Sequence, residues 1–186
     1  FIVLTIVLAS ALLSAIVLYG FGVMQETQNR NQKTAQIMYH AISEQQGQEL
    51  YKQEEIAWVG EFFNAFSEQV NHSTVNFTYA NADMLTSQSM PYSGDLPASE
   101  NEIVVQESFL DSLGYSNELG QTIQIPFSDG TTHDFKLTGI LDVKTGDIGR
   151  YTAIISKELV RQQYGDGGMI DYYICLLYTS PSPRDG

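Results

Sequence analysis

Three histidines are the first candidates for chemistry in this sequence, because imidazole is a common metal ligand and general base. His40, His72 and His133 are widely separated and lack a metal-ligand spacing such as H-x-x-x-H. The sequence contains no G-x-S-x-G nucleophile elbow and no G-x-x-x-x-G-K phosphate loop. We therefore expect no catalytic residue, no metal and no cofactor, and no ATP hydrolysis by this chain itself.

The acidic residues show no ligand pattern either. Glu54 and Glu55 are adjacent, so their side chains do not face each other on a helix. Asp147 and the stretch 166–168 are typical of turns and lack the alternating oxygen ligands of a calcium loop.

The composition excludes several classes of protein. The chain has 22 acidic and 9 basic residues, a net charge of −13, and a single cysteine. A disulfide framework and a cysteine-based zinc site are therefore excluded. No basic patch exists for nucleic acid, and the negative charge would repel an anionic membrane surface.

The first 23 residues form an apolar run without a charged side chain, and the first charge is Glu26. A helix over 1–23 would be roughly 35 Å long, which is enough to cross a hydrocarbon core of about 30 Å. The alternative is a signal peptide cut after Ala11, but the run exceeds a normal signal-peptide core. We predict a transmembrane helix over 1–23. Because Phe1 is not an initiator methionine, we expect the chain to be a fragment.

The last twelve residues, 175–186, have no periodicity and are rich in Ser and Pro. They resemble a translated sequencing adapter, so we predict a non-native tail there and exclude it from the fold. The alternative is a native Pro/Ser tail. The predicted native region ends near Ile174.

Between these ends, the polar stretch 24–34 predicts a stalk, followed by an extracytoplasmic core domain over 35–174. Loose alternation predicts a strand over 35–42. Three of its residues should share one face: Ile37, Tyr39 and Ala41. Ser43 and Gln46 have the spacing of a capping box, which predicts a helix over 44–54 with Leu50 in the core.

Strands are predicted over 56–66 and 73–80 from their aromatic and β-branched residues. The alternative is one long helix over 25–70, against which Gly47 and Gly60 argue mildly. We interpret the aromatic residues Trp58, Phe62 and Phe63 as core rather than as a binding platform.

The second half is rich in turn residues, and Pro91 and Pro97 frame a loop. Strands are predicted over 102–105, 121–127, 133–141 and 151–156, with one more beginning near Met169. Helices are predicted over 109–114, capped by Ser108 and ended by Gly114, and over 157–165. Asp129 and Gly130 mark a hairpin turn, and one face of its second strand should carry Phe135, Leu137 and Gly139. The fold class is therefore mixed α+β.

Two glycines in this half carry structural expectations. Gly120 should have a positive φ before a strand, and Gly139 should mark a bulge or a close packing contact.

Six short motifs occur in a particular order along 94–159: Gly94-Asp95-Leu96-Pro97, Asn101-Glu102-Ile103-Val104-Val105, Leu113-Gly114, Leu119-Gly120-Gln121-Thr122-Ile123, Lys136-Leu137-Thr138-Gly139-Ile140-Leu141, and Ala153-Ile154-Ile155-Ser156-Lys157-Glu158-Leu159. Their order resembles the extracytoplasmic domain of FtsX-like ABC transporter permeases, the group that includes the MacB-type exporters. The resemblance covers about 1–174.

The resemblance implies a permease subunit of a bacterial plasma membrane, multi-pass in its full-length form, with residues 24–174 outside the cytoplasm. It also implies a cytoplasmic ABC ATPase subunit and a permease dimer or paired permease as partners, besides the lipid bilayer. Two alternatives remain open. One is a single-pass anchored binding or sensor domain without an ATPase, and the other is a secreted hydrolase with an unrecognised site.

Overall fold

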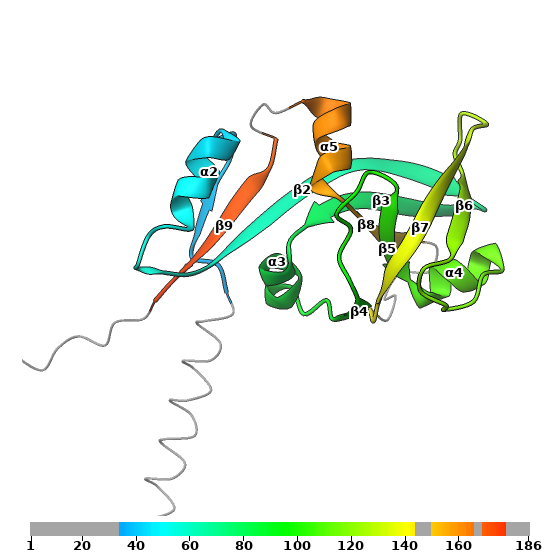
Figure 1. Ribbon diagram of the computed structural model, residues 1–186, viewed down its shortest axis with the longest axis horizontal. Helices are drawn as coiled ribbons and strands as arrows, with labels where there is room; N and C mark the ends of the chain where they lie inside the picture. Colours follow the sequence, from blue (N-terminus) through cyan, green and yellow to red (C-terminus); the bar gives the residue numbers. More distant parts are fainter. Residues whose placement is uncertain (1–33, 144–149, 166–168, 178–186) are drawn as a thin grey trace, which may run out of the picture.

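The structure is a computed structural model that describes residues 34–143, 150–165 and 169–177. The predicted membrane helix over 1–23 lies outside the described residues, as does the predicted stalk except for Thr34. Within the described ranges, no helix combines the length and hydropathy needed to cross a membrane. These ranges form a mixed α+β domain, as predicted (Figure 1).

The described strands form one nine-stranded sheet in the order β1-β9-β2-β3-β8-β5-β7-β4, with β6 paired to β7. The strands are β1 (Ile37–Tyr39), β2 (Ile56–Val70), β3 (Ser73–Ala80), β4 (Tyr92–Gly94), β5 (Glu102–Gln106), β6 (Thr122–Pro126), β7 (Thr132–Leu141), β8 (Arg150–Ile155) and β9 (Asp171–Leu176). The helices are α2 (Glu44–Leu50), α3 (Ala82–Ser87), α4 (Glu107–Leu113) and α5 (Lys157–Tyr164). Two pairs, β3 with β8 and β5 with β7, are parallel, and the others are antiparallel.

Strand β2 connects the two ends of the domain. Its first half pairs with β9 and its second half with β3, so it runs from the end that holds β1 and α2 to the end that holds the β6–β7 hairpin (Figure 1). The alternative of one long helix is therefore wrong for residues 34–70. The turn to β3 has a positive φ at both Asn71 and His72, which matches the twist of a tight hairpin.

The core consists of two clusters on opposite faces of the sheet. In β5, Ile103 and Val105 belong to the larger cluster and Val104 belongs to the smaller one. In β8, Ile154 likewise faces away from its neighbours Ala153 and Ile155. Strands that are buried on both faces have nearly continuous apolar sequences, which explains why apolar and polar residues alternate little in 102–105 and 151–156.

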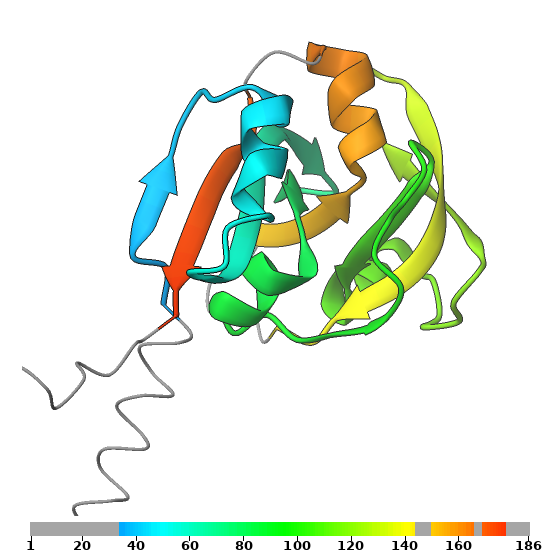
Figure 2. The same cartoon turned by 60° about the vertical axis from the view of Figure 1, so that its left-hand side comes forward.

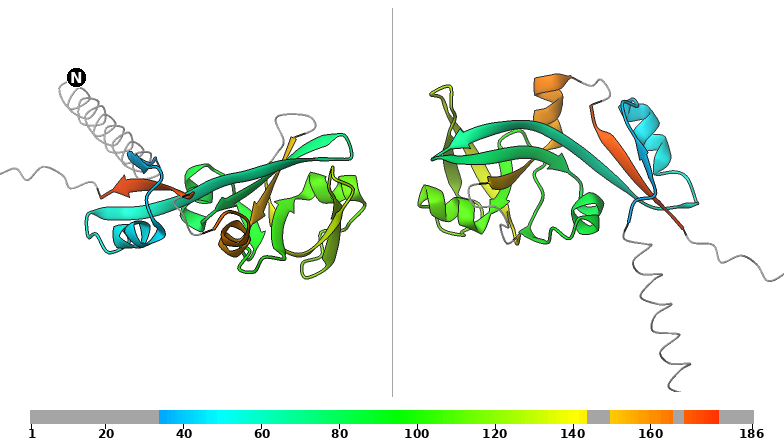
Figure 3. Two further views of the ribbon diagram at one scale, coloured as in Figure 1. Left: turned by 90° about the horizontal axis from the view of Figure 1, so that it is seen from above. Right: turned by 180° about the vertical axis from the view of Figure 1, so that it is seen from behind.

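The sheet is strongly bent between its two ends (Figure 2). Seen from above, α2 and α5 lie on the same side of β2 (Figure 3). This common side is where the charged residues described below meet.

Several predicted boundaries change. Strand β1 covers only Ile37–Tyr39, and its three residues are all exposed. Ala41 adopts a positive φ of 53°, which ends the extended backbone before the α2 cap. The capping box of Ser43 and Gln46 is present, but α2 ends at Leu50, which is half-buried.

The predicted cap of α4 is wrong. The helix begins at Glu107, its N-cap is Gln106 without a side-chain cap bond, and Ser108 lies within the first turn. The predicted end is confirmed, because Gly114 adopts the left-handed conformation at φ 80°. Helix α3 and strand β4 were not predicted at all.

The predicted close contact at Gly139 is confirmed. A Cβ there would lie 2.5 Å from the Ser93 carbonyl oxygen of β4, so only glycine fits. The predicted buried face of β7 is also confirmed, because Phe135, Leu137 and Gly139 are buried. Gly120 has the expected positive φ of 89°.

Strand β9 extends two residues beyond Ile174. Cys175 is buried and pairs with Trp58, and Leu176 pairs with Ile56. The non-native origin of 175–186 stays a prediction.

Candidate functional site

A buried carboxylate lies on β2, on the side of the strand that α2 and α5 share (Figure 3). Glu61 is only 3% exposed. Its oxygens accept hydrogen bonds from the hydroxyls of Tyr51 at 2.9 Å and Tyr79 at 2.5 Å. The Lys157 ammonium, from the first turn of α5, lies 3.0 Å away and balances the charge. A buried charge needs such partners, because desolvation without them costs several kcal/mol.

Asn81 fixes the backbone around this carboxylate. Its side-chain oxygen accepts from the backbone N–H of Glu61 and of Met84, each at 3.0 Å, so it also caps α3. Its side-chain nitrogen donates to the Val59 carbonyl at 2.9 Å. One polar residue thereby connects α3 to β2.

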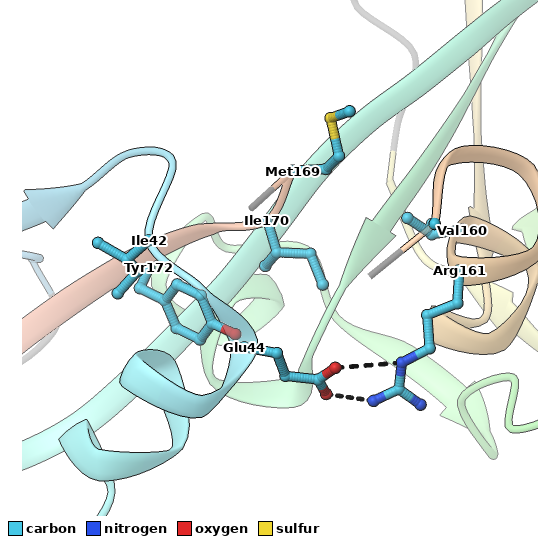
Figure 4. Close-up of a pocket in the computed structure, with 8 residues that line it drawn as sticks. Ile42, Glu44, Val160, Arg161, Met169, Ile170 and Tyr172 are labelled. Carbon is cyan, nitrogen blue, oxygen red and sulfur yellow. Dashed lines mark hydrogen bonds and ion pairs between the residues drawn. The ribbon is translucent and has the colours of Figure 1, made fainter. Parts of the chain in front are cut away.

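A second carboxylate extends the arrangement to α2. Glu44, in the first turn of α2, lies 3.3 Å from the Lys157 ammonium and accepts two hydrogen bonds from the Arg161 guanidinium (Figure 4). Lys157 therefore bridges Glu44 and Glu61. We call these four residues, Glu44, Glu61, Lys157 and Arg161, the junction network.

The electrostatics favour the ionised form of Glu44 and the protonated form of the phenols beside Glu61. Burial opposes ionisation of Glu44, but the Arg161 hydrogen bond and the Lys157 charge outweigh it and lower the pKa of this carboxyl. Burial and then the Glu61 charge raise the pKa of the Tyr51 and Tyr79 hydroxyls well above the usual range. Tyr51 and Tyr79 therefore act as hydrogen-bond donors rather than as bases.

Tyr172 of β9 packs directly against α2. A Cβ at Gly47 would lie 2.1 Å from Cζ of the Tyr172 ring, so the ring occupies the space of a side chain. The Tyr172 hydroxyl is buried without a hydrogen-bond partner among the described residues, and burial raises its pKa to about 12. It points to the side of α2 that carries Glu44 (Figure 4).

The network consists of paired charges. It holds no nucleophile with an adjacent base, and its two acids are each paired with a cation. Charged hydrogen bonds of this kind fix one element against another. The network joins α2, β2 and α5, of which α5 lies far from the other two in the sequence.

The three histidines lie apart from this site and from each other. His40 is 2.7 Å from Asp171, His72 is in the β2–β3 turn, and His133 packs on Phe127 with ring centroids 4.2 Å apart. No group of three metal-ligating side chains occurs within the residues that the structure describes.

The aromatic residues of β2 are half-buried. Phe63 packs on the larger core cluster and Phe62 on the smaller one. Trp58 lies beside Gly60, where a Cβ would be 3.1 Å from its ring. This packing agrees with the core role expected of Phe62 and Phe63, whereas Trp58 packs on neither core cluster.

Sequence reasoning missed Glu61, Asn81 and Lys157. One signal was available, because Glu61 interrupts an otherwise apolar and aromatic strand. The identity of its partners could not be read, since Lys157 comes from an element far along the chain and Tyr79 reaches Glu61 only through the register of β2 with β3.

Known proteins share this architecture. The periplasmic region of MacB from Actinobacillus actinomycetemcomitans superimposes with a TM-score of 0.52 at 14% identity, covering 77% of this chain and 69% of that one. A domain of a putative permease protein from Porphyromonas gingivalis gives 0.55 at 11% identity, covering 82% and 79%. The extracellular domain of the noncanonic ABC-type transporter YknZ from Gram-positive bacteria gives 0.52 at 9% identity, covering 78% and 83%.

At these identities the likeness shows the fold alone. A search among curated proteins finds no match. The sequence profile described as "MacB-like periplasmic core domain" matches residues 1–182. The chain therefore belongs to the family of MacB-like periplasmic core domains, which are parts of ABC transporter permeases.

Proposed function

We propose that this chain is the first membrane helix and the extracytoplasmic domain of a permease subunit that moves with a separate cytoplasmic ABC ATPase. Family membership supports the permease context. The uncharged run over 1–23 supports the membrane anchor. In this proposal the chain transmits movement, as a permease dimer or paired permease, and carries out no catalysis.

The junction network is the observation that carries the proposal. Movement of a membrane helix would enter the domain next to Thr34, pass along β1 (Ile37–Tyr39) and reach α2 as the first helix, which begins at Glu44. From α2 the Glu44–Arg161 and Glu44–Lys157 pairs lead to α5, and Lys157 leads on to Glu61 of β2. Rigid elements joined by ion pairs that can rearrange are a common basis of such transitions.

The test uses the intact permease in membrane vesicles with its ATPase. A fluorophore is placed on a cysteine at Asp111, an exposed residue of α4 at the end of the domain remote from α2. A flexible Gly/Ser insertion within 24–34 should abolish the ATP-dependent fluorescence change while ATP hydrolysis continues. The same insertion in the β6–β7 turn, between Asp129 and Gly130, is the control and should leave the change intact. A full fluorescence response with the stalk insertion would contradict the proposal.

A further inference from the structure

A cavity lies beside α5, between β2 and the β6–β7 hairpin, and shares no residue with the junction network. Its volume is about 190 Å³. Aromatic rings and carboxylates line it together: Phe66, Phe127, His133, Phe135, Glu100 and Asp134. The remaining lining residues are uncharged, so no lysine or arginine among the described residues lines this cavity.

The rings are held in a fixed arrangement. Phe66 and Phe127 meet edge to face with ring centroids 6.0 Å apart. Phe77 stacks on Phe66 with ring centroids 4.6 Å apart. The hairpin loop is anchored to β2, since the Glu68 carboxylate accepts from the backbone N–H of Ser128 at 3.1 Å and from its hydroxyl at 2.7 Å. Phe127 is therefore positioned before any ligand arrives.

The carboxylates make the cavity electronegative. Asp134 accepts one hydrogen bond, from the Gln124 side chain at 3.0 Å. Glu100 is exposed and has no hydrogen bond or ion pair with any residue that the structure describes. The net charge of −13 adds a long-range attraction for cations.

This combination selects one ligand chemistry. The ring faces carry partial negative charge and attract a cation by about 0.5–2 kcal/mol, and a carboxylate supplies the counter-charge. An anion would be repelled, and a compact metal ion would find rings in place of a full oxygen or nitrogen ligand set. The volume is below the about 300–1,000 Å³ of pockets for drug-sized ligands, so it fits one small head group.

We propose that this cavity binds an alkylammonium group, such as the head group of a small organic cation. A lysine side chain also carries an alkylammonium group, so the test below compares a small organic cation with a lysine side chain. The proposal is independent of the transport role.

The test measures binding to the full chain in a non-ionic detergent by saturation-transfer NMR. Choline is compared with 3,3-dimethylbutan-1-ol, its neutral isostere, at low salt and at pH 8, where imidazole side chains are generally neutral. Choline should bind at least about five-fold more tightly than the isostere, as expected for about 1 kcal/mol of cation–π and charge attraction. Equal binding of the two compounds would overturn the proposal.

Two variants and one control locate the site. Phe127→Leu keeps an apolar side chain but removes the ring, and Glu100→Gln removes an exposed charge without disturbing the core. Each should weaken choline binding several-fold, whereas Asp83→Asn on the distant α3 should not. Unchanged binding in Glu100→Gln and Phe127→Leu would assign choline to another place and overturn the proposal. N-acetyl-lysine methylamide is the final arm, and tighter binding than choline would identify a lysine side chain as the source of the ammonium group.

Discussion

At the scale of single residues, helix propensity and tertiary packing favour different residues at Gly47. It occupies the middle of α2, where glycine is usually less favourable than alanine by about 0.5–1 kcal/mol. The Tyr172 ring lies where the alanine side chain would be, 2.1 Å from the position of its Cβ. The contact is with a ring that is itself buried, because Tyr172 is 1% exposed.

Gly47→Ala should therefore destabilise the domain by about 1–3 kcal/mol, the usual cost of overpacking, despite the gain in helix propensity. Urea unfolding measures the change. Gln48→Ala, at the next and exposed position of α2, is the control and should change stability by less than about 0.5 kcal/mol. A stabilised Gly47→Ala variant would show that the Tyr172 ring can move away.

Tyr79 gives a residue-scale prediction about pH. Burial, and then the Glu61 charge and hydrogen bond, raise the pKa of its hydroxyl in the folded state. In the unfolded chain a tyrosine loses its proton near pH 10. Its contribution to stability is therefore complete below about pH 10 and declines as the pH rises further, because only the unfolded state then releases the proton.

The free energy of unfolding should thus fall above pH 10, with Tyr79 contributing up to about 1.4 kcal/mol per pH unit. Tyr79→Phe should show a shallower decline over the same range, and the two proteins share all other titrating groups. Denaturant unfolding at a series of alkaline pH values measures both slopes. Identical slopes would mean that the Tyr79 hydroxyl ionises equally in both states.

At the scale of elements, the ion pairs between α5 and its neighbours differ in burial from those on the surface. The side chains of Lys157 and Glu61 are 19% and 4% exposed, whereas those of Lys52 and Glu49 are 66% and 56% exposed. Breaking a buried pair from one side leaves an uncompensated charge and typically costs 3–5 kcal/mol. An exposed pair contributes about 0–1 kcal/mol.

Lys157→Met should destabilise the domain by about 3–5 kcal/mol, because Glu61 stays buried without its cation. The double variant Glu61→Gln/Lys157→Met should lose less than Lys157→Met alone, since the charge is then gone. Lys52→Met is the matched control, with an expected loss of at most about 1 kcal/mol. Urea unfolding of the three variants checks this order. A double variant with a lower free energy of unfolding than Lys157→Met would contradict it.

The elements also show what the sequence could predict. The hairpin at Asp129-Gly130 and the helix end at Gly114 follow from local backbone preferences, and both are correct. Helix α3 was missed although its cap is local, because Asn81 accepts from the Met84 N–H three residues on and Asn is a favoured N-cap residue. The bond from the Glu61 N–H to the same Asn81 oxygen joins α3 to β2 across the fold, and no local pattern contains that contact.

At the scale of the whole molecule, the order of short motifs predicted the family correctly, although each motif had only a structural meaning of its own. The junction network could not be predicted in the same way. Its four residues come from α2, β2 and α5, and their meeting depends on how the chain folds around β2. Composition indicated only the excess of acid, and not that Glu61 would be buried beside Lys157 or that Glu44 would pair with two cations.

The last prediction concerns the whole permease. If α2 drives α5 through the junction network, then weakening the Glu44–Arg161 pair should reduce transmission without unfolding the domain. The Arg161 and Glu44 side chains are 38% and 29% exposed, so their pair should contribute about 1 kcal/mol, or about five-fold in a two-state equilibrium. Arg161→Gln should therefore lower the ATP-dependent response of the α4 fluorophore while ATP hydrolysis continues. Lys136→Gln, which removes an exposed cation outside the network, should leave the response unchanged, and a full response in Arg161→Gln would exclude this pair from the route.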